Sequence, residues 1–251
     1  MPLISITTPS YGRQKLLERQ HRIVAAQSVE DFEWLILDDS PEPSPYFLGL
    51  ADPRVRYQHS ATRLTIGAKR NLLAEQAGAP VIAHFDDDDY YAPDYLKTML
   101  EHLSRNGADM VKLSAWYIYS LRHRQLGYWD TNITSGLAYR MAQDGVTPLM
   151  ISEEDGKVLE NNYAGYGNTY VYRKSVWREF RFPDLNFAED QVFADAIIAG
   201  GCRFAHFHDT ERLTLKIMRE DGVSIAWPQW LLPNFLLTQL FPAPALEMLA
   251  D

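Results

Sequence analysis

The chain has 251 residues, of which 46% are hydrophobic and 23% are charged, as is usual for a globular protein. Its 33 acidic and 24 basic residues give a net charge of −9, which argues against non-specific binding of DNA or RNA. A single cysteine, Cys202, excludes an intramolecular disulfide. We find no signal-peptide pattern and no unbroken apolar stretch that could span a membrane, so we expect a cytoplasmic protein, either free or peripheral to the inner face of a membrane.

The first 120 residues alternate between strand and helix patterns. Apolar runs rich in β-favouring residues predict strands over residues 3–7, 33–37, 54–58, 80–85 and 108–119. Helical spacing of apolar residues predicts helices over residues 13–27, 67–77 and 93–105. Residues 41–53 carry four prolines and are expected to form a loop. Alternation of this kind predicts a largely parallel sheet that is covered by helices.

The second half of the chain is less regular. Residues 120–187 mix Tyr, Gly and Asn with short strand-like pieces; beyond them we expect a helix over 188–199 and strands over 203–207 and 212–218. Apolar spacing between Trp227 and Leu249 predicts a C-terminal helix that either packs on the core or pairs with a second subunit. We therefore predict one domain over 1–224, with halves 1–120 and 121–224, and an apolar helical extension over 225–251.

Four consecutive carboxylates, Asp86 to Asp89, follow the strand predicted over 80–85. Ligands of open α/β sheets bind at the carboxyl ends of the strands. Like charges this close repel each other unless a cation is present, and Mg²⁺ and Mn²⁺ prefer carboxylate oxygens. The motif therefore indicates a divalent-metal site; the alternative is a solvated acidic turn in which Asp89 caps the next helix.

Two further motifs stand at strand or helix ends in the first half. Asp38 and Asp39 follow the second strand, where acids hydrogen-bond a ribose or base in dinucleotide-binding folds but are also ordinary turn residues. Gly67 opens a helix whose first turn carries Lys69 and Arg70. Cations there oppose the helix dipole, which is reasonable if they bind an anion such as phosphate; the alternative is a pair of surface cations.

Two motifs stand out in the second half. Glu189 and Asp190 open the helix over 188–199, where acids are favoured by the helix dipole or serve as a general base that faces a cleft. His206 and His208 alternate on a predicted strand and share one face, so they either complete a metal site or are ordinary residues at the rim of the sheet.

Taken in order, these motifs resemble those of an inverting glycosyltransferase of family 2 with the GT-A fold. The resemblance rests on residues 4–11, 37–40, 67–71, 85–89 with Pro93, and 188–190. Each motif alone is weak, but five in the right order at strand or helix ends are specific. The resemblance implies an α/β, Rossmann-like GT-A fold: a mostly parallel central sheet flanked by helices, in a single domain with an irregular acceptor-side second half.

The resemblance also implies roles in binding a nucleotide-sugar donor. Thr8, Pro9 and Tyr11 would line the nucleotide pocket, and Asp39, with Asp38, would contact the base or ribose. The other donor-binding residues would be Lys69, Arg70, Asp86 and Asp87.

The remaining implied roles concern the metal and the base. Asp88 would hold Mn²⁺ or Mg²⁺, and Asp86 would contact either the ribose or the metal. Pro93 decides which of the four acids match the family motif, because the usual family spacing puts an acid, here Asp89, four residues before that proline. Asp190 would be the catalytic base, and Glu189 would orient a substrate or cap the helix.

The expected reaction is metal-dependent transfer of a sugar, with inversion, from a nucleotide diphosphate to a glycan or other hydroxyl acceptor. We expect a UDP-sugar as donor and no nucleic-acid partner, and a homodimer through the C-terminal helix remains open. Two alternatives remain. A sugar-phosphate nucleotidyltransferase would need a glycine-rich loop after the first strand, whereas residues 8–13 hold one glycine. A non-catalytic nucleotide-sugar or glycan-binding module would bind without turnover.

One family feature is missing. Family members often carry a late His, shortly before a Ser, as a metal ligand, but residues 218–224 contain none. Either His206 or His208 substitutes for it, or the metal relies on Asp88, phosphate and water. Arg219 is a further candidate contact for the diphosphate.

Overall fold

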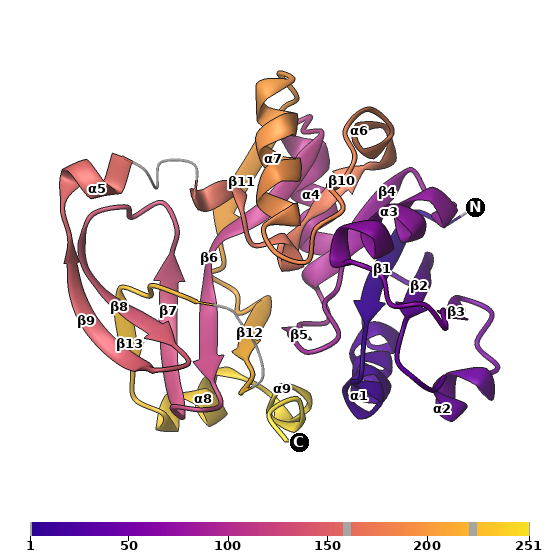
Figure 1. The fold of residues 1–251 in the computed structure, drawn as a ribbon, viewed down its shortest axis with the longest axis horizontal. Helices are drawn as coiled ribbons and strands as arrows, with labels where there is room; N and C mark the ends of the chain where they lie inside the picture. Colours follow the sequence, from indigo (N-terminus) through magenta and orange to yellow (C-terminus); the bar gives the residue numbers. More distant parts are fainter. Residues whose placement is uncertain (1, 158–161, 221–224, 251) are drawn as a thin grey trace. The chain divides into compact units, whose positions relative to one another are not determined.

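The structure is a computed structural model that describes residues 2–157, 162–220 and 225–250 (Figure 1). The chain divides into two compact units whose segments interleave along the sequence. The first unit comprises Met1–Asp88, Pro93–Lys112 and Ala164–His206. The second comprises Asp89–Ala92, Leu113–Tyr163 and Phe207–Asp251.

The first unit is built on parallel strands. These are β1 (Ile4–Ser10), β2 (Phe32–Asp38), β3 (Val55–His59) and β4 (Val81–His84), in the spatial order β3-β2-β1-β4. Strand β10 (Val171–Arg173) pairs antiparallel with β4 and with the first residues of β6 (Met110–Ser120). Strands β1, β2 and β4 are buried almost throughout, because helices cover both faces of the sheet.

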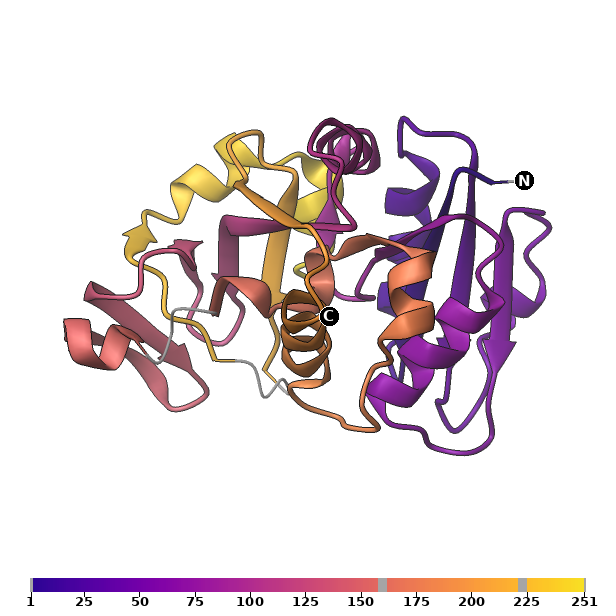
Figure 2. The ribbon, with the colours of Figure 1, turned by 90° about the horizontal axis from the view of Figure 1, so that it is seen from above.

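Helices of the first unit lie on both sides of these strands. They are α1 (Gln14–Ala25), α2 (Pro45–Leu48), α3 (Ile66–Gln76), α4 (Tyr95–Arg105), α6 (Lys174–Glu179), α7 (Glu189–Ala199) and the 3₁₀ turn η2 (Gly167–Thr169). His21 of α1 and Phe47 of α2 both contact the ring of Trp34 on β2. Helix α3 packs against β1 and β2 from the other side (Figure 2). Right-handed crossovers require this placement, because the strand order reverses between β3 and β4.

That reversal places the ends of three strands together. Strand β1 has β2 on one side and β4 on the other, so the chain leaves Ser10, Asp38 and His84 at the same edge of the sheet. Such a switch point is where open α/β sheets bind ligands. The segments that follow these residues, 11–13, 39–40 and 85–88, carry the site described below.

The second unit contains most of β6 and the elements paired with it. Its strands are β5 (Tyr90–Tyr91), β7 (Gln125–Asp130), β12 (Thr214–Met218), β13 (Trp230–Leu232) and the hairpin of β8 (Gly136–Ala142) and β9 (Gly145–Ile151). Its helices are α5 (Glu153–Lys157), α8 (Phe235–Leu240) and α9 (Ala243–Glu247). Strand β11 (Phe204–His208) and the 3₁₀ turn η1 (Asn162–Ala164) belong in part to each unit.

The alternation predicted for the first 120 residues is confirmed, with boundaries within about three residues. One detail was missed: the loop predicted over 41–53 contains the short helix α2, which Pro45 begins. Proline is favoured at a first helical position because its missing N–H would have no partner there. No helix within residues 2–157, 162–220 and 225–250 has the length and hydrophobicity that crossing a bilayer requires.

The single C-terminal helix predicted between Trp227 and Leu249 is wrong. The segment forms strand β13 and the short helices α8 and α9 instead. Pro233 and Pro242 stand between these elements, because a proline inside a helix removes a hydrogen bond and clashes with the preceding turn. Packing on the core is confirmed within the second unit, where β13 pairs with β7 and Phe241 contacts the rings of Tyr90 and Tyr117. Dimerisation stays a prediction.

Replacing Phe241 by Ala should destabilise the protein by about 3 kcal/mol, because a buried aromatic leaves a cavity that its neighbours fill only in part. Phe241 is 3% exposed, whereas Phe235, six residues earlier, is 63% exposed and is the matched control. Phe235→Ala should cost less than about 0.5 kcal/mol. Urea unfolding measures both, and equal losses would show that α8 and α9 are not anchored through Phe241.

Candidate active site

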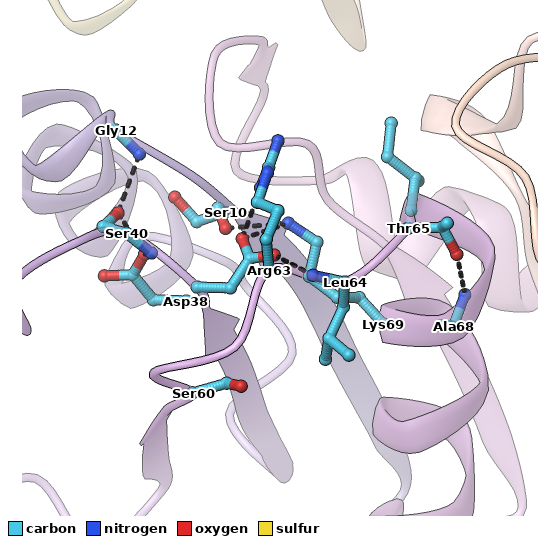
Figure 3. Close-up of polar contacts among 12 residues, drawn as sticks. Ser10, Gly12, Asp38, Ser40, Ser60, Arg63, Leu64, Thr65, Ala68 and Lys69 are labelled. Carbon is cyan, nitrogen blue, oxygen red and sulfur yellow. Dashed lines mark hydrogen bonds and ion pairs between the residues drawn. The ribbon is translucent and has the colours of Figure 1, made fainter.

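Asp39, at the end of β2, is the centre of a cluster of cations in the first unit. Its Oδ1 accepts hydrogen bonds from Lys69 Nζ (2.8 Å) and Arg63 Nη1 (2.6 Å), and its Oδ2 accepts one from the Leu64 N–H (2.7 Å) (Figure 3). Burial raises the pKa of Asp39, but the Leu64 N–H and the two cations outweigh it, so the net pKa lies below its usual value. Asp39 is therefore an anion in a fixed position.

Lys69 ties this cluster to β1. Its Nζ donates to the carbonyl of Ser10 (2.9 Å) as well as to Asp39. Burial lowers the pKa of Lys69, and the neighbouring Asp39 opposes that shift. Beside the cluster, the guanidinium of Arg63 lies 3.4 Å from the centroid of the half-exposed Tyr11 ring. A flat cationic and aromatic surface thus borders Asp39, and such a surface can stack with a nucleobase.

Asp38 and Thr8 are turned into the fold. The Oδ1 of Asp38 accepts hydrogen bonds from both the N–H and the hydroxyl of Ser40, and its Oδ2 accepts one from the Tyr57 hydroxyl (2.7 Å). The hydroxyl of Thr8 accepts a hydrogen bond from the indole N–H of Trp34 (2.9 Å). Both side chains are buried, at 1% and 0% exposed. These contacts favour a role in supporting the loops, rather than in binding the donor, for Asp38 and Thr8. Pro9, which follows Thr8, is half-buried.

Arg13 joins the acidic turn, which the sequence analysis did not predict. Its Nη1 donates to Asp87 Oδ1 (3.1 Å) and Asp88 Oδ2 (2.5 Å). The hydroxyl of Ser10 also donates to Asp87 (2.6 Å). Burial and the adjacent Asp88 raise the pKa of Asp87 to about 6, against the effect of Arg13 and Ser10. The signal for Arg13 was its position, three residues after Ser10, the last residue of β1.

Arg70 links three elements of the first unit. Its guanidinium lies 3.2 Å from Glu189 Oε1 on α7, 3.0 Å from His84 Nδ1 on β4 and 3.4 Å from Asp86 Oδ1. Burial disfavours its charge, but Asp86 and Glu189 outweigh that effect, so its pKa is raised. Burial and Arg70 together hold the pKa of His84 well below its usual value, so the imidazole is neutral. Arg70 is thus a buried structural cation rather than a surface one.

Asp190 is held by backbone N–H groups. Its Oδ2 accepts a hydrogen bond from the Gly167 N–H (2.7 Å), and its Oδ1 accepts one from the Gln191 N–H (2.8 Å). A Cβ on Gly167 would lie 2.8 Å from the Cβ of Asp190, so only glycine permits this approach. Ala188 precedes the helix with a φ of 61°, in the left-handed region that a non-glycine residue rarely adopts. The carboxylate therefore has one fixed orientation, as a positioned base requires.

Two apolar residues anchor the helix that carries Asp190. Phe193 and Ile197 are fully buried, whereas Val192 is 46% exposed. Glu189 is buried, and burial raises its pKa against the effect of Arg70. Glu189 therefore forms a buried ion pair with Arg70.

A model of the glycosyl transferase family 2 matches residues 5–152, more than half of the chain. The chain belongs to this family. Among curated members, the putative colanic acid biosynthesis glycosyl transferase WcaA of Escherichia coli K12 is 34% identical over 105 residues, which are 40% of this chain and 38% of that protein. EpsJ of Bacillus subtilis 168, an uncharacterized glycosyltransferase, is 24% identical over 232 residues, which are 90% of this chain and 61% of that protein.

Solved structures confirm the GT-A fold. TarS of S. aureus, in complex with UDP-GlcNAc, superposes with a TM-score of 0.65 at 18% identity, over 89% of this chain and 60% of that one. The mannosyltransferase PcManGT of Pyrobaculum calidifontis, in complex with GDP-Man and Mn²⁺, gives 0.62 at 14% identity, over 88% and 59%. This chain therefore spans less than two thirds of the length of each of these relatives.

The acidic turn of this family member offers oxygen ligands that fit a divalent cation. Asp86, Asp88 and Asp89 each place a carboxylate oxygen within 4.8 Å of the others, and no other such group of acids, histidines or cysteines occurs within the described residues. Asp89 is fully buried and accepts hydrogen bonds from Lys216 Nζ (3.0 Å) and the Ile217 N–H (2.9 Å). The alternative in which Asp89 caps the next helix is wrong, because the N-cap residue of α4 is Asp94.

The residues predicted to replace the late histidine lie elsewhere. His206 and His208 do not belong to that group of ligands. His208 Nε2 lies 3.3 Å from Asp130 Oδ2 and 3.1 Å from Asn132 Nδ2. Arg219, the candidate diphosphate contact, donates to the carbonyl of Met248 (2.5 Å), and residues 221–224 lie outside the described part of the chain.

Replacing Arg70 by Met should destabilise the protein by roughly 3–5 kcal/mol at pH 8, because Glu189 would keep a buried charge without its partner. Burial raises the pKa of Glu189, so its ionised form costs stability as the pH rises above the value of the unfolded chain, about 4.3. The loss of stability in Arg70→Met should therefore be smaller at pH 5, where the Glu189 carboxyl can be protonated. Chemical unfolding at the two pH values measures it.

The matched control is Arg54→Met, which removes an arginine that pairs with Asp52 at 2.8 Å on the surface. Its cost should stay below about 1 kcal/mol at both pH values. Equal effects of the two substitutions would contradict the central place given to Arg70.

Proposed function

We propose that this chain transfers a sugar, with inversion, from a nucleotide diphosphate to an acceptor hydroxyl. The observation that carries the proposal is the Asp190 carboxylate, which two backbone N–H groups orient beside the Arg70 network. In the same unit, Asp39, Lys69 and the Tyr11–Arg63 surface stand at the ends of β1 and β2. A general base and a nucleotide-binding edge on one unit are what an inverting transfer needs.

We assign the donor to the edge of the first unit and favour a UDP-sugar. Asp39 would accept hydrogen bonds from the base or ribose, and the Tyr11–Arg63 surface would stack on the base. TarS, whose structure contains UDP-GlcNAc, supports uridine, whereas the mannosyltransferase neighbour contains GDP-Man. The choice between the two bases is therefore part of the test.

Asp86 and Asp88 would hold Mn²⁺ or Mg²⁺. When bound, such a cation would offset the negative charge of the diphosphate as it leaves. Mn²⁺ in the mannosyltransferase neighbour supports this assignment. Arg13 already brings a positive charge to Asp88, so the acidic turn is not held together by a metal alone.

The proposed chemical step needs one base and no covalent enzyme intermediate. Asp190 accepts the proton of the acceptor hydroxyl while the acceptor oxygen bonds to the anomeric carbon. The bond from that carbon to the diphosphate oxygen breaks on the opposite face, and the nucleoside diphosphate leaves with the electron pair. Because the Gly167 and Gln191 N–H groups fix the carboxylate, little reorganisation accompanies proton transfer.

Replacing Asp190 by Asn should lower turnover on the order of 10²–10⁴-fold, because the amide cannot accept the proton. Donor affinity should change little, since the nucleotide is bound by the other strand ends. Release of the nucleoside diphosphate measures turnover, with water as the acceptor. The product anomer, identified by NMR, tests inversion.

Asp195→Asn is the matched control, because Asp195 lies on the same helix and accepts an exposed hydrogen bond from the Gln191 side chain (2.8 Å). It should keep full turnover. If Asp190→Asn also keeps full turnover and only lowers the melting temperature, Asp190 is a helix cap and the assignment of the base fails.

A thermal-shift panel of UDP-, GDP-, dTDP- and CDP-sugars, each with Mn²⁺, Mg²⁺ or EDTA, should show the largest shift with a UDP-sugar and metal, because a ligand that binds the native state stabilises it by mass action. Asp88→Asn should remove the metal-dependent part of the shift. Asp94→Asn, at an exposed acid that contacts Ser28, should leave it unchanged. If no nucleotide gives a shift with any metal, the proposed function is wrong.

A further inference from the structure

A buried lysine contacts the segment that holds Asp190. Lys112, on β6, is 0% exposed, and its Nζ donates a hydrogen bond to the carbonyl of Gly165. The same Nζ lies 5.4 Å from the centroid of the Tyr166 ring and 6.0 Å from that of Tyr170. One ammonium group thus contacts three residues of the segment 164–170.

The same segment contacts Asp190 through Gly167, two residues after Gly165. The Gly167 N–H donates to the Asp190 carboxylate. The Tyr170 hydroxyl donates to the Ala164 carbonyl (2.5 Å) and lies 3.2 Å from the Asp190 carbonyl. The Gly167 carbonyl lies 2.9 Å from His84 Nδ1, which is also 3.0 Å from the Arg70 guanidinium. Between these contacts Tyr166 adopts a φ of 66°, in the left-handed region. A non-glycine residue keeps such a conformation only where its surroundings impose it.

We infer that Lys112 is a positioning residue for the base: it holds residues 165–167 so that the Gly167 N–H meets the Asp190 carboxylate. This inference rests on the proposed function for its catalytic consequence, but the placement of the segment can be tested without any substrate. Nothing in the sequence motifs of the donor site includes Lys112, which stands in the apolar run of β6.

The cost of keeping Lys112 in the interior supports a role beyond stability. Burial lowers the pKa of Lys112 to about 7, while the Asp190 charge opposes that shift. A buried cation is expensive, and replacing one by an apolar side chain of similar size is often neutral or stabilising. When protonated, Lys112 interacts favourably with the Asp190 carboxylate, and an apolar side chain would not.

The test replaces Lys112 by Met, which keeps the length of the side chain and removes the ammonium. We expect kcat to fall on the order of 10- to 100-fold, as for a small displacement of a catalytic group, with the KM for the donor unchanged. The melting temperature should stay the same or rise. By hydrogen exchange, the Gly167 amide should lose protection selectively, while the amides of β1 and β2 keep theirs.

Lys174→Met is the matched control. Lys174 also donates to backbone carbonyls, those of Glu75 (3.0 Å) and Ala77 (2.5 Å), and lies 5.8 Å from the Trp177 ring. It should leave both kcat and the exchange of Gly167 unchanged. If Lys112→Met does not fold, Lys112→Leu, which also lacks an N–H donor for the Gly165 carbonyl, takes its place with the same two measurements.

Selective loss of protection at Gly167 together with a lower kcat supports the inference. Unchanged exchange at Gly167, or loss of protection in all amides alike, overturns it, because Lys112 would then be either idle or a general stabiliser. A wild-type protein that turns over no nucleotide sugar would refute the proposed function instead, and the exchange of Gly167 would still decide whether Lys112 positions the segment.

Discussion

The buried guanidinium of Arg70 is the interaction on which the site depends. It lies at the meeting of α3, β4 and α7, and it contacts Asp86 and Glu189, which would otherwise carry like charges in a space of low dielectric. Removing the cation would leave those charges uncompensated, whereas removing a single acid would leave the cation with the other. A planar fork of five donors reaches several acceptors at once, which a lysine ammonium cannot do with the same geometry.

The other charges of the first unit follow the same rule. Asp39 is compensated by Lys69 and Arg63, and Asp87 and Asp88 are compensated by Arg13. Asp39, Asp87 and Asp88 therefore each meet a cation from another segment of the chain. Arg13 therefore offsets part of the repulsion within the acidic turn, although Asp88 still raises the pKa of Asp87, and a divalent cation would compete with Arg13 for Asp88.

The sequence was sufficient to predict the parts of the fold that local rules decide. Strands β2 and β4 are mostly apolar and β1 begins with β-favouring residues, while α1 and α4 have clear helical spacing, so the alternation and the sheet type could be predicted. The prediction of a single C-terminal helix was wrong because apolar spacing does not take account of Pro233 and Pro242. A proline inside a helix removes a hydrogen bond and interrupts the helix. Motif order predicted Asp39, Asp88 and Asp190 as site residues, since each stands at an element end.

What could not be predicted depends on contacts between distant segments. Asp38 and Asp39 are adjacent and look alike in the sequence. Asp38 supports a loop through Ser40 and Tyr57. Asp39 instead contacts Lys69 on α3 and Arg63 in the segment that precedes α3. Only the fold distinguishes them. Lys112 is the extreme case: a lone lysine in an apolar strand is usually expected to face water, because a charge so placed is costly. Its burial becomes reasonable once Gly165, Tyr166 and Asp190 are seen around it, and a cost that the fold could avoid with a methionine is most simply explained by what the ammonium holds in place.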